Sequence, residues 1–339
     1  MKPASFRRLF AATAIAAAGL AIAPAHAGPF SDLFIFGDSL SDSGNIATVF
    51  TVNGLPFSPP PPSGDYVPSA PYEPYGVFSN GPVWATSFSA ALGVDAAPSL
   101  LGGTNYAYGG ARTATDGAPA LGGVPFSLKT QVNQFLGTYG SAPGDALYVV
   151  AGGSNNLRDA AAAFGAAGSF AEQIAIAAAA SSQFATDIGG IVDQLQAAGA
   201  QSIVVWNLPD VGLSPAAAAL GPVAQSVSTL LATTMNDALA YRLQGEAGVI
   251  EFDTFGLVQG IVAGSPGNGF VNVTDACGFV GNNCDPATAL FWDGIHPTAY
   301  AHSVLANQMF AAVVPEPETA LLFAFGLAGL LAWSRRRAA

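Results

Sequence analysis

Basic side chains are scarce in this sequence. It has 10 lysines and arginines against 22 acidic residues, and most of the basic ones lie near the two ends of the chain. Between Gly28 and Ser334 there are only four basic residues but all 22 acidic ones, a formal charge of −18 for this segment. The four are Arg112, Lys129, Arg158 and Arg242. A surface with this balance repels phosphate backbones and anionic lipids, so nucleic acid is excluded as a partner.

Histidine and cysteine are also rare, with three and two residues. His26 falls in a predicted leader, so only His296 and His302 remain for chemistry in the mature chain. Cys277 and Cys284 stand close together in ACGFVGNNC, and such a pair in an exported chain predicts a disulfide bond. A zinc site is the alternative, but this spacing without a nearby histidine pair suits zinc poorly.

Export is predicted from residues 1–27. A few basic residues precede an apolar, alanine-rich run over 9–22, and residues 24–27 (PAHA) supply an Ala-x-Ala cleavage site. An uncleaved membrane anchor is the alternative, but the apolar run is short and ends in small residues. We therefore expect a signal peptide that does not enter the fold.

Short apolar runs alternate with helical patterns along the rest of the chain. The runs that predict buried strands are 33–36, 145–150, 202–206 and 249–253. Four stretches predict helices. The first opens at the proline that follows the glycine within 78–84, and it ends at Leu92. The others are 169–198, with a break near Gly189-Gly190, 223–243 and 297–313. This alternation predicts one α/β domain over 28–313, with a parallel sheet flanked by helices on both faces.

Residues 51–76 are predicted to be a loop, because their many prolines forbid regular helix or sheet. Tyr66, Tyr72 and Tyr75 are interleaved with these prolines. They could line a substrate entrance or pack the loop onto the core, and packing is the preferred alternative.

The first apolar run leads directly into Gly37-Asp38-Ser39 and a polar turn. A serine on a sharp turn after a buried strand lies at the carboxyl edge of a parallel sheet, where open α/β folds place their sites. Its hydroxyl can face a crevice beside backbone N–H donors, which is the geometry that a nucleophile requires. An ordinary turn is the alternative, and the tripeptide alone does not exclude it.

Asp293 and His296 stand three positions apart near the end of the domain. On a turn, this spacing lets a carboxylate oxygen reach Nδ1 of the imidazole, which fixes the tautomer and leaves Nε2 free to take a serine proton. Pro297 then opens the last helix. His302 falls inside that helix, where we expect it on the surface or in packing.

Two further stretches offer hydrogen-bond donors. Gly109-Gly110 end an Asn-Tyr-Ala-Tyr run, and glycines there let backbone N–H groups approach a ligand closely. An ordinary loop turn is the alternative. Asn155 comes just past the strand predicted at 145–150, with a side-chain amide that can donate.

Together these pieces resemble the GDSL or SGNH family of hydrolases. GDSLSDSGN, NYAYGGA, GGSNN and DGIHP occur in the family's order over about residues 32–313, and FSNGPVW and VVWNLPDVG look like further stretches of it. The resemblance implies a three-layer α/β/α sandwich with a flavodoxin-like parallel sheet. It also implies hydrolysis of carboxylic esters, with no metal and no cofactor.

The resemblance assigns roles to particular residues. Ser39 corresponds to the nucleophile, His296 to the general base and later general acid, and Asp293 to the carboxylate that orients it. The oxyanion donors would be the Ser39 N–H, the Asn155 side chain and one glycine N–H, of which Gly110 is preferred to its neighbour.

The sequence departs from the family pattern at two positions. Asn156 stands where relatives usually have aspartate, which puts its support of the loop in doubt. Val77 stands where arginine commonly precedes the FSNGP stretch, which is expected to alter substrate contacts. Neither change removes a catalytic group.

The end of the chain, residues 314–339, has a composition of its own. Val314-Pro315-Glu316-Pro317 is followed by an apolar stretch over 320–333 and then by three arginines. As a helix, this stretch rises only about 21 Å against a hydrocarbon core of roughly 30 Å, but snorkelling arginines would let it just span. The order resembles the PEP-CTERM sorting signal of Gram-negative bacteria that make exopolysaccharide, and a plain tail anchor is the alternative. The resemblance implies processing by an exosortase.

The sequence therefore predicts an exported serine esterase or lipase at the cell surface or outside the cell. Its expected partners are a lipid, small-ester or polysaccharide-ester substrate, signal peptidase, an exosortase, and the membrane through the C-terminal segment. One alternative is a deacetylase of acetylated exopolysaccharide. The other is a non-catalytic surface or biofilm-matrix protein on a hydrolase scaffold, against which the intact Ser39, Asp293 and His296 argue.

Overall fold

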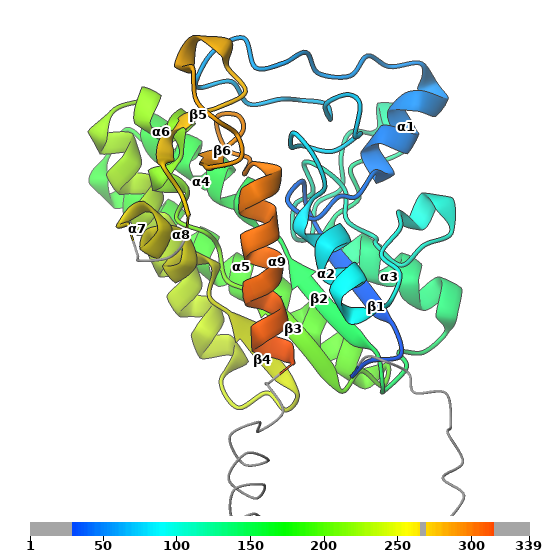
Figure 1. Ribbon diagram of the computed structural model, residues 1–339. Helices are drawn as coiled ribbons and strands as arrows, with labels where there is room; N and C mark the ends of the chain where they lie inside the picture. Colours follow the sequence, from blue (N-terminus) through cyan, green and yellow to red (C-terminus); the bar gives the residue numbers. More distant parts are fainter. Residues whose placement is uncertain (1–28, 265–268, 315–339) are drawn as a thin grey trace, which may run out of the picture.

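A parallel sheet forms the centre of the computed structural model, which describes residues 29–264 and 269–314. Its strands, in spatial order, are β1 (Leu33–Gly37), β2 (Leu147–Ala151), β3 (Ser202–Trp206) and β4 (Val249–Phe252) (Figure 1). All of them follow the predicted apolar runs to within two residues. The predicted signal peptide and the predicted anchor segment after residue 314 lie outside the described residues.

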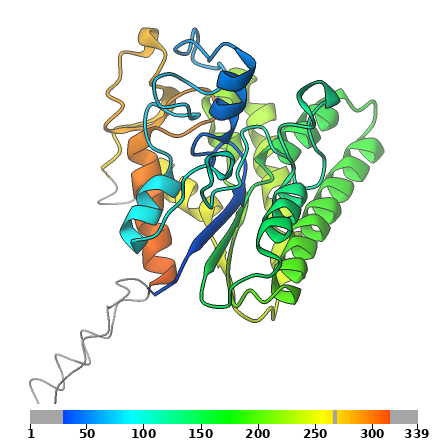
Figure 2. The same cartoon turned by 90° about the vertical axis from the view of Figure 1, so that its right-hand side faces the viewer.

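Helices cover both faces of this sheet (Figure 2). The α-helices of the described part are α1 (Asn45–Asn53), α2 (Trp84–Leu92), α3 (Leu128–Tyr139), α4 (Ser154–Ala166), α5 (Phe170–Ala197), α6 (Pro215–Ala219), α7 (Pro222–Leu243), α8 (Thr254–Val262) and α9 (Ala299–Val313). Successive strand side chains point to opposite faces, so Phe34 and Phe36 pack with α3, α4, α5 and α7, whereas Leu33 and Ile35 pack with α2 and α9. The predicted three-layer sandwich is confirmed.

A short segment extends the sheet beyond β1. The Ile35 N–H donates to the Thr104 carbonyl at 3.2 Å, and the Tyr106 N–H donates to the Ile35 carbonyl at 2.7 Å. This segment follows β1 in the chain but lies on its outer side, so the spatial order is segment, β1, β2, β3, β4. If the segment is counted as the second strand of the chain, this is the flavodoxin-like order. It also brings Gly109 and Gly110 to the carboxyl end of β1.

Helix α5 runs without interruption through the two glycines at which a break was predicted, so that prediction is wrong. Gly189 is buried, and a Cβ there would collide with the side chain of Arg242 from α7. A glycine costs about 1 kcal/mol in a helix interior, and packing against α7 outweighs that cost. Gly189 therefore allows a close approach between helices.

Helices α1, α3, α4, α6 and α8 were not predicted from the sequence. In α1, the capping acceptor is the Asp42 carboxylate, whose Oδ1 accepts the N–H groups of Gly44 at 2.8 Å and Asn45 at 2.7 Å. The helix continues to Asn53, so the proline-rich loop begins later than predicted.

A second, small parallel sheet precedes the last helix. It consists of β5 (Asn272–Ala276) and β6 (Ala289–Phe291). A disulfide joins Cys277 and Cys284, with 5.4 Å between their Cα atoms. The Cys277 N–H donates to the Phe291 carbonyl at 2.9 Å, so the disulfide-closed loop lies directly beside the chain that enters the Asp293 turn.

His302 is a packing residue of α9. Its side chain is only 1% exposed, which excludes the surface position that the sequence left open. Burial lowers the pKa of His302 to about 3, so the ring stays neutral in the folded protein.

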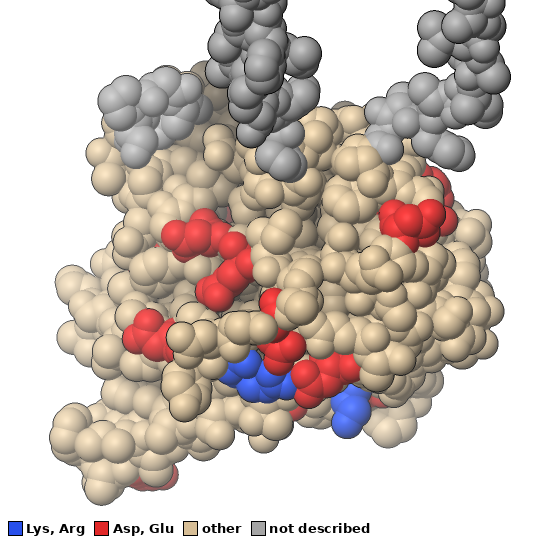
Figure 3. All heavy atoms as spheres, turned by 90° about the horizontal axis from the view of Figure 1, so that it is seen from below, with Lys and Arg blue, Asp and Glu red and all other residues tan. Residues whose placement is uncertain are grey.

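Charged groups are sparse on the surface. Seen from below, most of the protein surface is neither acidic nor basic, and the basic groups are small patches beside acidic ones (Figure 3). Within 29–264 and 269–314, no helix combines the length and apolar character needed to cross a bilayer.

Candidate active site

The serine turn is built on the end of β1. Gly37 is fixed there by Gln131 of α3, which accepts from the Gly37 N–H and donates to its carbonyl, both at 2.8 Å. The Asp38 carbonyl then accepts the N–H groups of Ser41 and Asp42, both at 3.0 Å. This tight turn leaves Ser39 at the carboxyl edge of the sheet, as predicted.

Ser39, His296 and Asp293 form one hydrogen-bonded chain. Ser39 Oγ lies 2.9 Å from His296 Nε2, and His296 Nδ1 lies 2.8 Å from Asp293 Oδ2. The His296 side chain is 4% exposed and that of Asp293 is fully buried. Side chains 257 positions apart in the sequence thus meet at one site, in the geometry that a nucleophile with a base requires.

Four donors surround the Asp293 carboxylate. Oδ1 accepts the N–H groups of Ile295 at 2.9 Å and His296 at 2.8 Å. Oδ2 accepts from the Tyr72 hydroxyl at 2.9 Å and faces the imidazole Nδ1. These hydrogen bonds fix the orientation of the Asp293 carboxylate. The contribution of Tyr72 was missed in the sequence, where it was only one aromatic residue in a proline-rich loop.

The two glycines have different roles. The Gly109 N–H donates to Asp42 Oδ2 at 2.8 Å and is therefore engaged. Gly110 has a φ of +83°, which favours glycine, and its N–H has no protein acceptor among the described residues. The same holds for the Ser39 N–H within this part of the chain. These two free donors are the ones expected for the oxyanion.

Asn155 lies in the first turn of α4 and is the third expected donor. One of its amide hydrogens donates to the Ala111 carbonyl at 3.0 Å, which places the amide beside the Gly110 turn. An amide has two such hydrogens, so a second one remains for a ligand.

Asn156 stands next to Asn155 and is the first of the two departures noted in the sequence. Asn156 Oδ1 accepts the Thr113 N–H at 3.0 Å, and its Nδ2 donates to Thr113 Oγ1 at 3.1 Å. The amide of Asn156 therefore supports the loop at Thr113 with two hydrogen bonds. Val77, the second departure, is buried in the core, and its carbonyl accepts the Tyr72 N–H at 2.8 Å.

Two asparagines tie the serine turn to the glycine segment. Asn45 Nδ2 donates to the carbonyls of Asn105 at 2.8 Å and Ala107 at 2.9 Å. Asn105 Nδ2 in turn donates to the Ser41 carbonyl at 2.7 Å. Both belong to the family stretches in the sequence, but only the fold shows that they hold the two donor loops together.

A cavity of about 950 Å³ opens beside Ser39 and His296. Much of its wall is apolar and comes from α4, α6 and α7, including Leu157, Ala161, Phe164, Ala217, Val223 and Val227. Arg112 on its wall is paired with Asp159, whereas Arg158, one turn beyond Asn155, forms no ion pair with the described residues. The cavity therefore combines a largely apolar wall with the side chains of Ser39 and His296.

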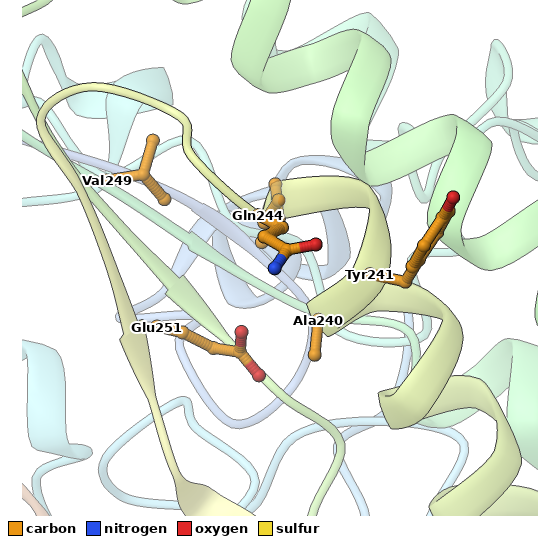
Figure 4. A pocket seen from close by; sticks show the side chains of 6 residues that line it. Ala240, Tyr241, Gln244, Val249 and Glu251 are labelled. Atoms are coloured by element: carbon orange, nitrogen blue, oxygen red, sulfur yellow. The ribbon is translucent and has the colours of Figure 1, made fainter.

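A smaller cavity of about 350 Å³ lies between β4 and the end of α7 and shares no lining residue with the first. Figure 4 shows Gln244 and Glu251 directed into this hollow, while the ring of Tyr241 points away from Glu251. It holds no nucleophile beside a base, so the chemistry is assigned to the cavity at Ser39.

Asp38, next to the serine, is buried with only partial hydrogen bonding. Its Oδ1 accepts the Leu40 N–H at 3.1 Å, while Oδ2 has no partner among the described residues. Burial raises the pKa of Asp38 to about 6, against the lowering effects of the Leu40 N–H and the charge on His296. The protonated form therefore stabilises the fold. That contribution is complete below about pH 4 and is lost as the pH rises through about 6.

Asp38→Asn should remove this pH dependence, because asparagine keeps an acceptor for the Leu40 N–H but does not titrate. Between pH 4 and pH 7 we expect the free energy of unfolding of the variant to rise relative to wild type by on the order of 3 kcal/mol. Urea unfolding followed by tryptophan fluorescence at several pH values measures the difference. A difference that does not change with pH would contradict the expectation.

The sandwich and the site at its sheet edge are typical of the SGNH class of α/β/α proteins. The sequence profile described as GDSL-like lipase/acylhydrolase matches residues 33–309, and the chain belongs to this family. A second profile, the PEP-CTERM protein-sorting motif, matches residues 313–337 and indicates an exported protein of a Gram-negative bacterium.

Two sequence relatives are named as esterases or lipases. The chain is 29% identical to esterase EstA of Pseudomonas aeruginosa over 90% of its own length, and 26% identical to a GDSL esterase/lipase of Arabidopsis thaliana over 82%. These matches cover 50% and 86% of the relatives, so the chain spans about half the length of the Pseudomonas protein. An extracellular lipase from Streptomyces rimosus aligns in structure with a TM-score of 0.45 and 18% identity, over 83% of this chain and 99% of that one.

Proposed function

We propose that this protein is an exported carboxylic ester hydrolase with Ser39 as its nucleophile. The observation that carries the proposal is the hydrogen-bonded chain from Ser39 through His296 to Asp293. Beside it lie the N–H groups of Ser39 and Gly110, which have no acceptor within the described part of the chain. His296 Nε2 takes the hydroxyl proton as Ser39 Oγ forms a bond to the ester carbonyl carbon. Asp293 holds the imidazole in the tautomer that this transfer needs.

The developing oxyanion is held by the N–H groups of Ser39 and Gly110 and by the free amide hydrogen of Asn155. The tetrahedral intermediate collapses, and the alcohol leaves with the proton from His296. Water then attacks the acyl-Ser39 ester, with His296 again taking and returning a proton, and the acid is released.

The cavity favours esters with an apolar acyl chain. Each methylene that moves from water onto the apolar wall contributes roughly 0.8 kcal/mol, or about a fourfold gain in kcat/KM per methylene while the groove has room. An acetyl group would leave most of a 950 Å³ cavity unfilled. We therefore infer medium-chain acyl esters as substrates rather than acetylated polysaccharide.

A series of p-nitrophenyl esters from acetate to palmitate tests the substrate. We expect kcat/KM to rise from acetate to medium chains, and Ala161→Phe, which fills the groove, to move the optimum to shorter chains. Ala240→Phe, in the smaller cavity at the end of α7, is the control and should leave the profile unchanged. A wild-type preference for acetate, with release of acetate from acetylated polysaccharide, would favour the deacetylase instead. No turnover of any ester would favour the non-catalytic scaffold.

The two ends of the chain complete the proposal. We infer that signal peptidase removes residues 1–27 and that an exosortase processes the segment after residue 313, which first holds the protein in the inner membrane. Both segments carry the sequence features for this, and the sorting-motif match supports the second. The hydrolase domain would then act at the cell surface or outside the cell.

A further inference from the structure

Tyr72 reaches the buried carboxylate from the proline-rich loop. Its side chain is 3% exposed, and its hydroxyl donates to Asp293 Oδ2 at 2.9 Å. This is the same oxygen that faces His296 Nδ1. The hydroxyl is therefore in contact with the charge that orients the imidazole, although 221 positions separate the two residues in the sequence.

We propose that Tyr72 is a positioning residue that fixes Asp293 Oδ2 and limits the proton affinity of the Asp293–His296 pair. The inference rests on the proposed function, because it assigns a fourth member to the same hydrogen-bonded chain. Nothing in the hydroxyl's position brings it to the reacting atoms, so it acts through the carboxylate.

The loop holds Tyr72 rigidly in this position. The Tyr72 N–H donates to the Val77 carbonyl at 2.8 Å, and its ring packs edge-on against Trp292, with centroids 6.1 Å apart. The Gly294 N–H donates to the Tyr66 carbonyl at 2.7 Å, so the loop also touches the Asp293 turn through the backbone. A Cβ at Gly294 would lie 2.6 Å from the Asp65 carbonyl oxygen, which shows how close this approach is.

The hydroxyl remains a donor at every pH at which the fold exists. Burial, and then the negative charge of Asp293, raise the pKa of Tyr72 far above its usual value. The phenol therefore stays protonated, and its hydroxyl keeps donating to Asp293 Oδ2.

Removal of the Tyr72 hydroxyl should therefore shift the pH–rate profile in a direction that can be stated in advance. Without this donor, more negative charge remains on Asp293 Oδ2, and a proton is bound more tightly whichever partner holds it. The base must be free of this proton to act, so the acid limb of the pH–rate profile should move to higher pH. A purely structural role would lower activity without moving that limb.

Other titratable groups lie around the pair and stay unchanged in the experiment. Asp38 and His302 both interact with His296, from the serine turn and from α9. Arg158 on α4 interacts with Asp293, and Tyr66 interacts with Tyr72 from the same loop. Because a Tyr72 variant alters none of them, a difference between the two profiles isolates the hydroxyl.

Tyr72→Phe is the test, measured as kcat/KM for a p-nitrophenyl ester from pH 4.5 to 9. We expect a loss of about tenfold near neutral pH and an upward movement of the acid limb by roughly one pH unit. Tyr148→Phe is the matched control, since it removes the hydroxyl of another buried tyrosine, which donates to the Pro143 carbonyl at 2.9 Å. That variant should keep the wild-type limb. An unmoved limb in Tyr72→Phe overturns the proposal.

Replacement of all tyrosines by 3-fluorotyrosine keeps every ring and hydroxyl in place and covers the case in which Tyr72→Phe does not fold. The fluorinated phenol is a stronger donor, so the limb should move the opposite way, to lower pH. No movement, or movement upward, contradicts the inference. Failure of the proposed function is distinct, because the wild type would then show no Ser39-dependent hydrolysis and no limb to measure.

Discussion

Ser39→Ala should lower kcat for p-nitrophenyl ester hydrolysis by about 10⁵-fold. The residual activity would come from the oxyanion donors and substrate binding alone. The reason is that no other hydroxyl in the described chain has an imidazole nitrogen at 2.9 Å. His296→Ala should cost about as much. Because the two act as a unit, the double variant should be no slower than either single one.

The control for this prediction lies in the same turn. Ser43 has its hydroxyl bonded to the Ala96 carbonyl at 3.0 Å and makes no contact with His296. Ser43→Ala should retain most of the wild-type kcat, and circular dichroism should show all three single variants folded. Substantial turnover by a folded Ser39→Ala protein would remove Ser39 from the mechanism.

Asn155→Ala should lower kcat by about 10²–10³-fold and leave KM nearly unchanged. The amide is proposed to donate to an oxygen that carries a full charge only in the transition state, so its loss affects the rate rather than ground-state binding. Asn155→Asp is the sharper variant, because it keeps the shape but replaces the donor by an acceptor. It should be at least as slow as Asn155→Ala at neutral pH.

A distant amide provides the comparison. Asn133 on α3 accepts from Gln194 at 2.8 Å on the exposed face of the helix layer, and Asn133→Ala should leave both constants at their wild-type values. If Asn155→Ala raises KM without lowering kcat, the amide binds substrate and is not an oxyanion donor.

The four strands of the main sheet, and the residues that form the chain from Ser39 to Asp293, could be located in the sequence because both have local signals. Buried parallel strands are continuous apolar runs, and all of β1, β2, β3 and β4 were found from them. With only two histidines left after the leader, and one of them three residues after an aspartate, the assignment of His296 needed little more than spacing.

The parts that escaped prediction depend on contacts between distant segments. The break expected in α5 does not occur because Gly189 meets Arg242 of another helix. The choice between Gly109 and Gly110 depends on which N–H the Asp42 carboxylate engages, and no local pattern encodes this. The bond from Tyr72 to Asp293 joins a loop that looked irregular to a turn at the other end of the domain.

A covalent label tests most directly whether Ser39 is an activated nucleophile. The protein is treated with a fluorophosphonate, digested, and its peptides are analysed by mass spectrometry. We predict a single stoichiometric adduct on Ser39, slowed strongly in His296→Ala and absent in Ser39→Ala. An unlabelled folded protein, or an adduct on another serine that persists in Ser39→Ala, would contradict the account.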